Sequence, residues 1–267
     1  MLKDITLGQY FPGNTVIHKL DPRTKLVITT LYIAVLFIAG NFISYSVVLA
    51  FLILSIYLSH IKLRVILRGI KPLIVIIIIT GLLNLFYTEG KELVSWWILT
   101  ITAEGIKRAV LMIMRIIMLI MGTFLLTYTT SPIQLTDGLE SLLSPLKKIR
   151  MPIHELSMMM SIALRFIPTL IEETDKIMRA QKARGADFET GNILQRAKAL
   201  LPLLIPLFVS AFRRADELAV AMESRCYHGG EGRTRMKQLI MQSRDWLTFL
   251  GGALLLVCII TLNVYGL

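Results

Sequence analysis

Uninterrupted apolar runs alternate with short polar segments along the first half of this chain. Residues 26–59 contain no charged side chain. As one helix this run would be about 50 Å long at roughly 1.5 Å per residue, whereas the hydrocarbon core of a bilayer is about 30 Å thick. The run therefore predicts two membrane-spanning helices joined by a turn near Gly40 and Asn41. Similar apolar runs predict three further spans, at 72–88, 109–130 and 246–267.

The composition agrees with residence in a membrane. Hydrophobic residues make up 55% of the 267 residues, and the mean hydropathy is +0.66, whereas a soluble domain is about 45–50% apolar. The first 25 residues carry several charges and lack the apolar stretch of a cleavable signal peptide. The two cysteines, Cys226 and Cys258, are too few for a disulfide framework.

Residues 131–245 have a different character, because they hold 17 of the 29 Lys and Arg residues and 13 of the 18 Asp and Glu residues. Lipid does not accommodate charge at this density. We therefore predict an all-α, polytopic membrane protein with about five transmembrane helices and a cytoplasmic domain of long amphipathic helices. Its predicted parts are an N-terminal segment (1–25), four spans (26–130), the cytoplasmic domain (131–245) and a last span (246–267).

The distribution of charge predicts the orientation. The N-terminal segment and the loop at 60–71 are basic, whereas the loop at 89–104 is net acidic. Because cytoplasmic loops are enriched in Lys and Arg, the N-terminus and the 131–245 domain are placed in the cytoplasm. The net charge of +11 is thereby explained without a nucleic-acid partner. Arg115 lies inside the fourth span near its outer end, and we expect its side chain to reach the headgroup region.

Two predicted helices of the 131–245 domain share the same sequence features. The first is predicted to begin or bend at Pro168 of an Ile-Pro pair, and the second to begin at Pro206 of another, after a separate helix that runs from Asn192 into Pro202. Each ends in a similar string, Ala180-Gln-Lys-Ala-Arg184-Gly185 and Ala221-Met-Glu-Ser-Arg225-Cys226. Apolar stripes at helical spacing predict that the two helices cross through these faces. Phe208 and Phe212 are assigned to the second stripe, and Glu172, Glu173 and Asp175 of the first helix are expected to point away from the crossing.

Arg184 and Arg225 occupy equivalent places in the two strings. Each lies seven residues after an apolar residue of its own stripe. Seven residues are nearly two helical turns, so each arginine lies on the same side of the helix as the stripe, rotated from it by about 20°. Each also lies in the last helical turn, where the negative end of the helix dipole favours a cation. An ordinary cation at a helix end would satisfy the same pattern, and docking of a partner is the alternative reading.

With these strings the sequence resembles the transmembrane T component of energy-coupling factor (ECF) transporters, which import vitamins and metal ions. The resemblance also rests on three other segments, Leu20-Asp-Pro-Arg-Thr-Lys25, Leu126-Thr-Tyr-Thr-Thr-Ser-Pro132 and Leu164-Arg-Phe-Ile-Pro168. These segments cover most of the chain in the expected order. The family's second motif is usually Ala-Arg-Gly, and here it reads Ser224-Arg225-Cys226.

The resemblance implies a subunit without catalytic residues, cofactor or metal. It implies two ABC-type ATPase subunits and a small membrane S component as partners, in a prokaryotic cell membrane. The ATPases would dock at Arg184 and Arg225 together with their flanking residues, Ala183, Gly185, Ser224 and Cys226. The methionine-rich segment, represented by Met158, Met159, Met160 and Ile162, either packs within the protein or forms an adaptable surface for S components.

Two other classes of function fit the sequence less well. A self-sufficient secondary transporter would have inverted repeats and acidic residues at broken membrane helices, and the only convincing repeat lies in the cytoplasmic domain. An intramembrane enzyme would need a cluster of acidic residues or histidines, and the four histidines are scattered without a paired-ligand pattern. No GxxxxGK[ST] loop is present, so ATP hydrolysis is expected on other chains.

Overall fold

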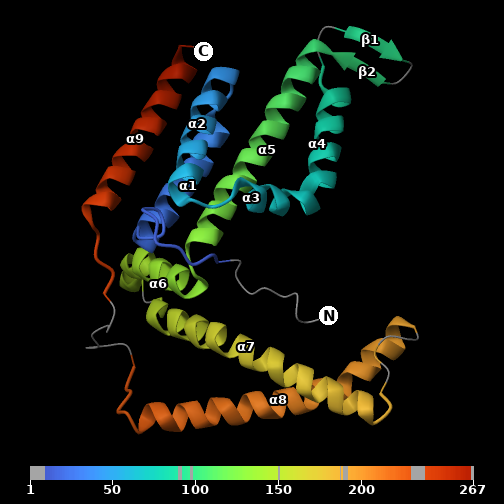
Figure 1. Cartoon of the computed structure of the whole chain (residues 1–267), viewed down its shortest axis with the longest axis vertical. Coiled ribbons are helices and arrows are strands. Elements are labelled where there is room, and N and C mark those ends of the chain that lie inside the picture. The colour runs from blue at the N-terminus through green and yellow to red at the C-terminus, as the bar shows by residue number, and fades with distance from the viewer. Residues whose placement is uncertain are drawn as a thin grey trace. The chain divides into compact units, whose positions relative to one another are not determined.

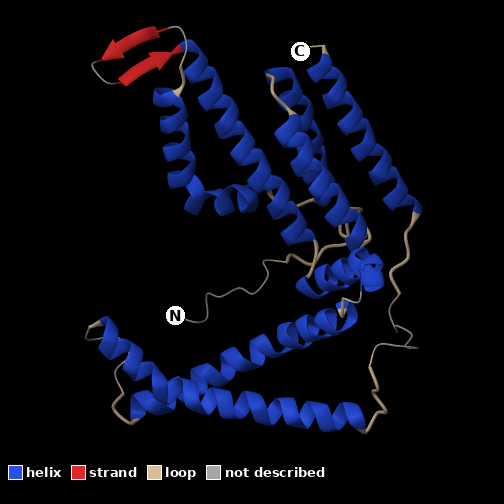
Figure 2. Ribbon diagram, turned by 180° about the vertical axis from the view of Figure 1, so that it is seen from behind, coloured by secondary structure: helices blue, strands red, loops and turns tan. Residues whose placement is uncertain are grey.

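The computed structural model describes residues 10–89, 92–96, 99–149, 151–186, 188, 192–229 and 238–265. Helices dominate these residues, as Figure 2 shows, and the predicted all-α membrane fold is confirmed. The chain divides into two compact units. The membrane unit comprises Gly8–Ser141 and Gln238–Leu267, and the two-helix unit comprises the described residues of Leu142–Lys237.

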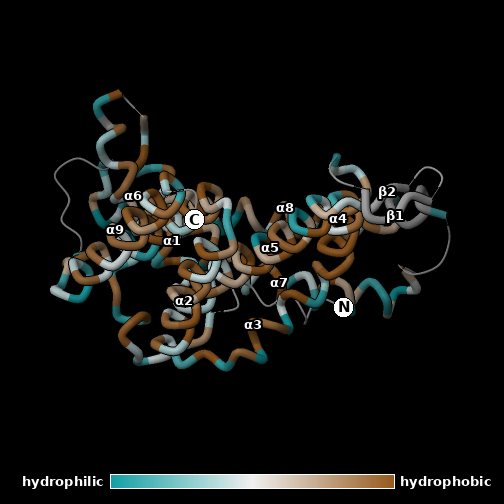
Figure 3. Tube along the Cα trace, turned by 90° about the horizontal axis from the view of Figure 1, so that it is seen from above, coloured by the Kyte–Doolittle hydropathy of each residue, from teal (hydrophilic) through white to brown (hydrophobic). Residues whose placement is uncertain are grey.

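The membrane unit contains α1 (Pro22–Ile38), α2 (Phe42–Ser59), α3 (Leu63–Ile70), a 3-10 turn (Lys71–Leu73), α4 (Ile74–Tyr87), α5 (Ala103–Thr129), α6 (Pro132–Leu143, at the boundary between the units) and α9 (Ser243–Val264) (Figure 1). Four helices of the described chain are long and apolar enough to cross a membrane, namely α2, the combined α3–α4 segment, α5 and α9. In Figure 3, α4 and α5 are predominantly coloured as hydrophobic. With 17 residues, α1 is about 26 Å long and lies at the lower limit for a span, so the count of five spans stays a prediction.

The helix boundaries follow local sequence signals. The turn predicted at Gly40 and Asn41 separates α1 from α2. Pro72 lies in the 3-10 turn, where α3 gives way to α4 and the chain changes direction (Figure 1). Ser131 caps α6 as its position before Pro132 predicts, because its hydroxyl accepts from the N–H of Gln134 and the Gln134 side chain accepts in return.

A short antiparallel hairpin, β1 (Glu92–Trp96) and β2 (Leu99–Thr102), connects α4 to α5. This hairpin was not predicted from the sequence. Thr102 ends the hairpin and also caps α5, because its hydroxyl accepts from the N–H of Gly105 at 3.0 Å and donates to the carbonyl of Thr88 at 2.9 Å. Strand pairing here satisfies the backbone groups of the connection between the two helices.

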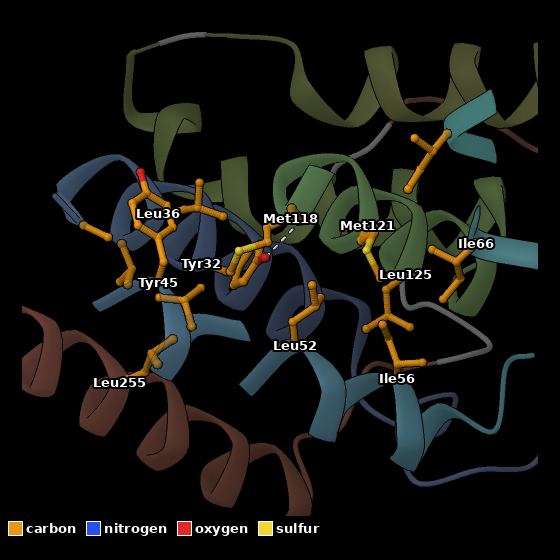
Figure 4. Close-up of a cluster of buried hydrophobic side chains, with 14 of the residues drawn as sticks. Tyr32, Leu36, Tyr45, Leu52, Ile56, Ile66, Met118, Met121, Leu125 and Leu255 are labelled. Atoms are coloured by element: carbon orange, nitrogen blue, oxygen red, sulfur yellow. Dashed lines mark hydrogen bonds between the residues drawn. The ribbon is translucent and has the colours of Figure 1, made fainter. Parts of the chain in front are cut away.

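The core of the membrane unit lies between α1, α2, α5 and α9 (Figure 4). Tyr32 is buried there, and its hydroxyl donates to the carbonyl of Met118 at 2.9 Å. Gly122 makes this packing possible, since a Cβ at that position would lie 2.4 Å from the Tyr32 ring. The close approach of α1 to α5 thus depends on a residue without a side chain.

Arg115 makes its polar contacts with α2 and with the end of α1, and the expected reach to the headgroup region stays a prediction. Its Nε donates to the Tyr45 hydroxyl at 2.7 Å, and its Nη2 donates to the carbonyl of Ala39 at 3.2 Å. The guanidinium also lies 5.7 Å from the centre of the Phe37 ring. The carbonyl at the end of α1 has no helical partner, so it provides an acceptor that the sequence pattern alone does not reveal.

A buried polar network ties the two ends of the membrane unit's sequence together. The Asp245 carboxylate accepts from the N–H of Asp21 and from the N–H of Gln242, both at 2.8 Å. Lys25 donates to the carbonyls of His18 at 3.1 Å and Thr129 at 2.9 Å. The network therefore holds the starts of α1 and α9 beside the end of α5.

Candidate functional site

The two-helix unit consists mainly of two rods of 31 residues, α7 (Ile153–Ala183) and α8 (Ile193–Glu223), preceded by a 3-10 segment (Ser144–Ile149). At 1.5 Å per residue each rod is about 46 Å long. The two rods run in opposite directions and cross (Figures 1 and 2). In agreement, the Gln181 side chain near the end of α7 donates to the carbonyl of Pro202 in the first half of α8, at 3.4 Å.

The prediction that a helix begins at Pro206 is wrong, and so is the first alternative for Pro168, that a helix begins there; the other alternative, a bend at Pro168, stays a prediction. Pro168 lies inside α7, and Pro202 and Pro206 lie inside α8, and both helices continue through these positions. A proline removes one backbone donor and crowds the carbonyl four residues before it, but contacts with the opposite rod on both sides of the prolines favour continuous helices. The repeat of the Ile-Pro pairs therefore marks positions within the rods and not their starts.

The two rods end in the same backbone motif. At the end of α7, the N–H of Gly185 donates to the Lys182 carbonyl and the N–H of Ala186 to the Gln181 carbonyl, both at 3.0 Å. At the end of α8, the N–H of Cys226 donates to the Glu223 carbonyl at 2.9 Å and the N–H of Tyr227 to the Met222 carbonyl at 3.0 Å. Both are Schellman motifs, which need a left-handed residue one position after the cap.

Arg184 and Arg225 occupy the same position in these motifs, immediately before the left-handed residue. Both arginines are exposed, and so are their predicted companions Ala183, Gly185, Ser224 and Cys226. The two strings, which are similar in sequence, therefore also have the same backbone geometry. Each rod presents a guanidinium on a rigid, capped end, with small neighbours that leave it accessible.

Cys226 takes the left-handed conformation although it is not a glycine. Its φ is 56°, whereas Gly185 has a φ of 87° at the equivalent place. A side chain in this region costs about 1–2 kcal/mol because Cβ approaches the following carbonyl. The end of α8 thus has the same backbone motif although its sequence is Ser-Arg-Cys, and Cys226 adopts a strained backbone conformation.

We expect Cys226→Gly to strengthen the α8 cap by about 0.5–1 kcal/mol. Amide hydrogen exchange of the purified protein would measure this, as slower exchange of the Tyr227 N–H that closes the motif. Cys226→Ala is the control, because it removes the thiol and retains the strained φ. Equal slowing in both variants would assign the effect to the thiol and contradict the backbone explanation.

A groove of about 500 Å³ lies next to Arg225 within the two-helix unit. Met158 and Ile162 of α7 and Leu218 and Met222 of α8 provide its apolar wall. Two members of the predicted methionine-rich surface therefore lie in the seam between the rods. The other two, Met159 and Met160, are exposed at 54% and 46%.

A polar cluster at the crossing was missed in the sequence analysis. Glu173 of α7 accepts from the Ser210 hydroxyl of α8 at 2.5 Å and from Nη2 of Arg214 at 3.0 Å. The expectation that Glu173 points away from the crossing is therefore wrong. In sequence it is one of several acids on a charged helix, and only the crossing point singles it out from Glu172 and Asp175.

The outer face of α8 is apolar and exposed. Phe208 and Phe212 are 61% and 69% exposed, contrary to their assignment to the crossing face. Leu203 is buried instead, and Leu218 and Met222 line the groove toward α7. The α8 sequence is apolar over more than one face, so helical periodicity alone could not decide which stripe meets α7. The exposed face comprises Leu201, Leu204, Ile205, Phe208, Val209 and Phe212.

This arrangement suits binding and transmission of movement. Among the described residues, no group of three or more His, Cys, Asp or Glu side chains could hold a metal ion. The prominent features are two equivalent cationic rod ends, a polar contact at the crossing and an uncovered apolar face. A guanidinium offers paired donors to a carboxylate, and a partner surface with acidic residues would match each rod end.

Comparison with known proteins gives a consistent family. The profile of the family described as CbiQ, cobalt transport protein, matches residues 13–236. A relative from Thermosediminibacter oceani, named energy-coupling factor transporter transmembrane protein EcfT, is 57% identical over 256 residues, covering 96% of this chain and 97% of the relative. A protein of the same name from Clostridium kluyveri is 55% identical, covering 98% of this chain and 98% of the relative. Another from Bacillus subtilis is 47% identical, covering 92% of this chain and 93% of the relative.

Proposed function

Because the chain belongs to the family of EcfT transmembrane proteins of energy-coupling factor transporters, we propose that it couples two ABC-type ATPase subunits to a substrate-binding S component. The observation that carries this proposal is the pair of equivalent, exposed arginines at the capped ends of two crossed rods. ATP hydrolysis resides on the partner chains, and this chain transmits the resulting movement. The transported substrate is a vitamin or a metal ion bound by the S component.

Each ATPase subunit docks on one rod end. Arg184 serves one subunit and Arg225 the other, each through paired hydrogen bonds to a carboxylate in the partner's groove. The small exposed neighbours, such as Ala183 and Ser224, let the partner surface approach the guanidinium. A long rod fixed at its tip converts a displacement of the ATPase into a displacement of the rod.

ATP binding closes the ATPase pair and moves one rod end relative to the other. The rods then slide and rotate about their crossing, where Glu173, Ser210 and Arg214 meet. Sliding of packed helices is an established kind of conformational change. The movement is passed to the S component, which is rocked within the membrane.

The S component contacts the methionine-rich face of α7 and the exposed face of α8. Met159 and Met160 offer flexible thioether surface that adapts to different S components. Phe208 and Phe212 add aromatic area, which dominates the energetics of many interfaces. Covering this face removes apolar surface from water.

The chain resides in the cytoplasmic membrane of a prokaryotic cell, with the N-terminus and the 131–245 coupling domain in the cytoplasm. The basic loop at 60–71 and the high charge of 131–245 support this orientation. Five spans, with α1 as the first, then leave the C-terminus outside. Four of these spans correspond to helices long and apolar enough to cross a bilayer.

The composition of the intact complex tests the proposal. We expect the tagged full-length chain, solubilised gently from its native membrane, to bring two ATPase chains and one S component with it. Native mass spectrometry would give the masses and the stoichiometry. A chain that purifies alone and still catalyses uptake in vesicles without ATPase subunits would be a secondary transporter, and the proposal would be wrong.

A further inference from the structure

A mainly apolar groove of about 360 Å³ lies within the membrane unit, apart from the rods. It is bounded by α1, α2, α5, α9 and the segment that precedes α1. Its volume lies in the range of small-molecule sites, about 300–1,000 Å³. Leucines of three different helices line it, among them Leu54, Leu126 and Leu247.

The groove begins at the ends of its helices and runs inward. Its outer part is made by Leu58 near the end of α2, Thr129 at the end of α5 and Arg244 near the start of α9. Its inner part reaches Gly251 of α9, seven residues and about 10 Å further along that helix. The groove is therefore cationic at the helix ends and apolar toward the middle of the unit.

Two cations belong to the groove, and no acidic residue lines it. Arg244 is exposed at the rim. Lys25 is only 6% exposed, and two of its three N–H groups donate to the carbonyls of His18 and Thr129. A lysine ammonium has three donors, so one remains for a ligand. The nearby Asp245 carboxylate accepts from two backbone N–H groups and is 1% exposed.

We propose that this groove binds one anionic membrane phospholipid, with its phosphate at Arg244 and one acyl chain along the apolar wall toward Gly251. The cations at one end of the groove match the phosphate of a lipid headgroup, and the leucines further along match its acyl chain. Burial of the acyl chain gains about 0.8 kcal/mol per CH₂ relative to water, but lipid already surrounds the protein. Selectivity therefore comes from the charge at the rim and from the shape of the groove.

Gly251 offers a way to fill the groove without disturbing the helix packing. A Cβ at this position meets no heavy atom within 4 Å, whereas a Cβ at Gly252 would lie 2.7 Å from Ile28. Gly251→Trp therefore occupies the space assigned to the acyl chain. Leu250→Trp is the matched control, since Leu250 is 59% exposed on the same helix and does not line the groove.

The test uses the full-length chain reconstituted in nanodiscs of phosphatidylglycerol and phosphatidylcholine, followed by native mass spectrometry of the lipid that remains bound. We expect one retained phosphatidylglycerol per chain. Arg244→Ala should lower its retention about tenfold, and Gly251→Trp should remove it. Arg68→Ala, which deletes an exposed arginine of α3 outside the groove, should leave retention unchanged.

Three results would overturn the proposal. Retention that survives Gly251→Trp and falls only with Arg244→Ala would show attraction to surface charge without an acyl-chain site. Displacement of the bound mass by inorganic phosphate would identify a free-anion site. A second protein chain in place of the lipid would make the groove a protein interface. Gly251→Met, with a smaller side chain, replaces the tryptophan variant if that variant does not insert into the membrane.

Discussion

Reversal of both rod-end charges, Arg184→Glu combined with Arg225→Glu, is expected to abolish association with the ATPase subunits. Arginine anchors in the centre of an interface each contribute about 2 kcal/mol or more, and a carboxylate facing a partner's carboxylate adds repulsion. Both side chains are exposed on capped helix ends, so the substitutions do not disturb the interior of the two-helix unit. Co-purification of the tagged chain from membranes measures the loss.

Matched controls for this experiment lie on the same rods. Arg179 of α7 and Arg213 of α8 are also exposed and lie within the helices, away from the capped ends. Their combined reversal to Glu should leave the ATPases bound. The single substitutions at Arg184 and Arg225 should each weaken association without abolishing it. Unchanged association in the double variant, with normal amounts in the membrane, would remove the docking assignment.

Disruption of the crossing is expected to slow transport about tenfold while the ATPases remain bound. Glu173→Lys would place a cation against Arg214, whose Nη2 now lies 3.0 Å from Glu173 Oε2. Two like charges about 4 Å apart repel by about 4 kcal/mol at an effective dielectric constant near 20. The side chains are 22% and 35% exposed, so solvent screening reduces the expected cost to about 1–2 kcal/mol.

The measurement is uptake of the substrate by cells that depend on this transporter, together with the amount of ATPase that co-purifies. Glu173→Lys should lower uptake about tenfold and leave association intact. The exchange Glu173→Lys with Arg214→Glu restores opposite charges across the crossing and should recover most of the uptake. Glu172→Lys, on the exposed side of α7, is the control. An exchange variant no better than the single variant would mean that this charge pair does not serve the crossing.

Much of the fold could be predicted because hydrophobic pattern and membrane thickness leave few choices. The turn at Gly40 and Asn41, the start of α6 at Pro132 and the apolar stretches of the membrane helices follow from rules that need no tertiary information. The hairpin between α4 and α5 was missed, because strands of five and four residues are too short for their alternation to be distinguished from an irregular loop.

The prolines show where local rules fail. A proline in a helical pattern predicts a boundary or a kink; a helix start was predicted at Pro206, and a start or a bend at Pro168. Both lie inside continuous helices. The loss of one backbone hydrogen bond is local, whereas contacts with the opposite rod extend over many turns, so the tertiary packing decides the outcome.

Some features of the candidate site could be predicted from the sequence, and others could not. The equivalence of Arg184 and Arg225 could be read from the two strings, because a cap is a local structure. The partners of Glu173 could not, because Ser210 and Arg214 are 37 and 41 residues away. Phe208 and Phe212 were placed on the wrong face for a related reason, since a helix apolar on several sides does not specify which side is covered.

The sequence by itself determined that this chain spans a membrane, carries a charged helical region and ends two of its helices in equivalent arginine motifs. These properties depend on residues close together along the chain and on the free energy of placing charge in lipid. Only the tertiary structure decided that Asp245 joins the start of α1, 224 residues earlier, and that Lys25 and Arg244 border one groove. Such contacts depend on which helices lie side by side, and helical periodicity carries no information about distant neighbours.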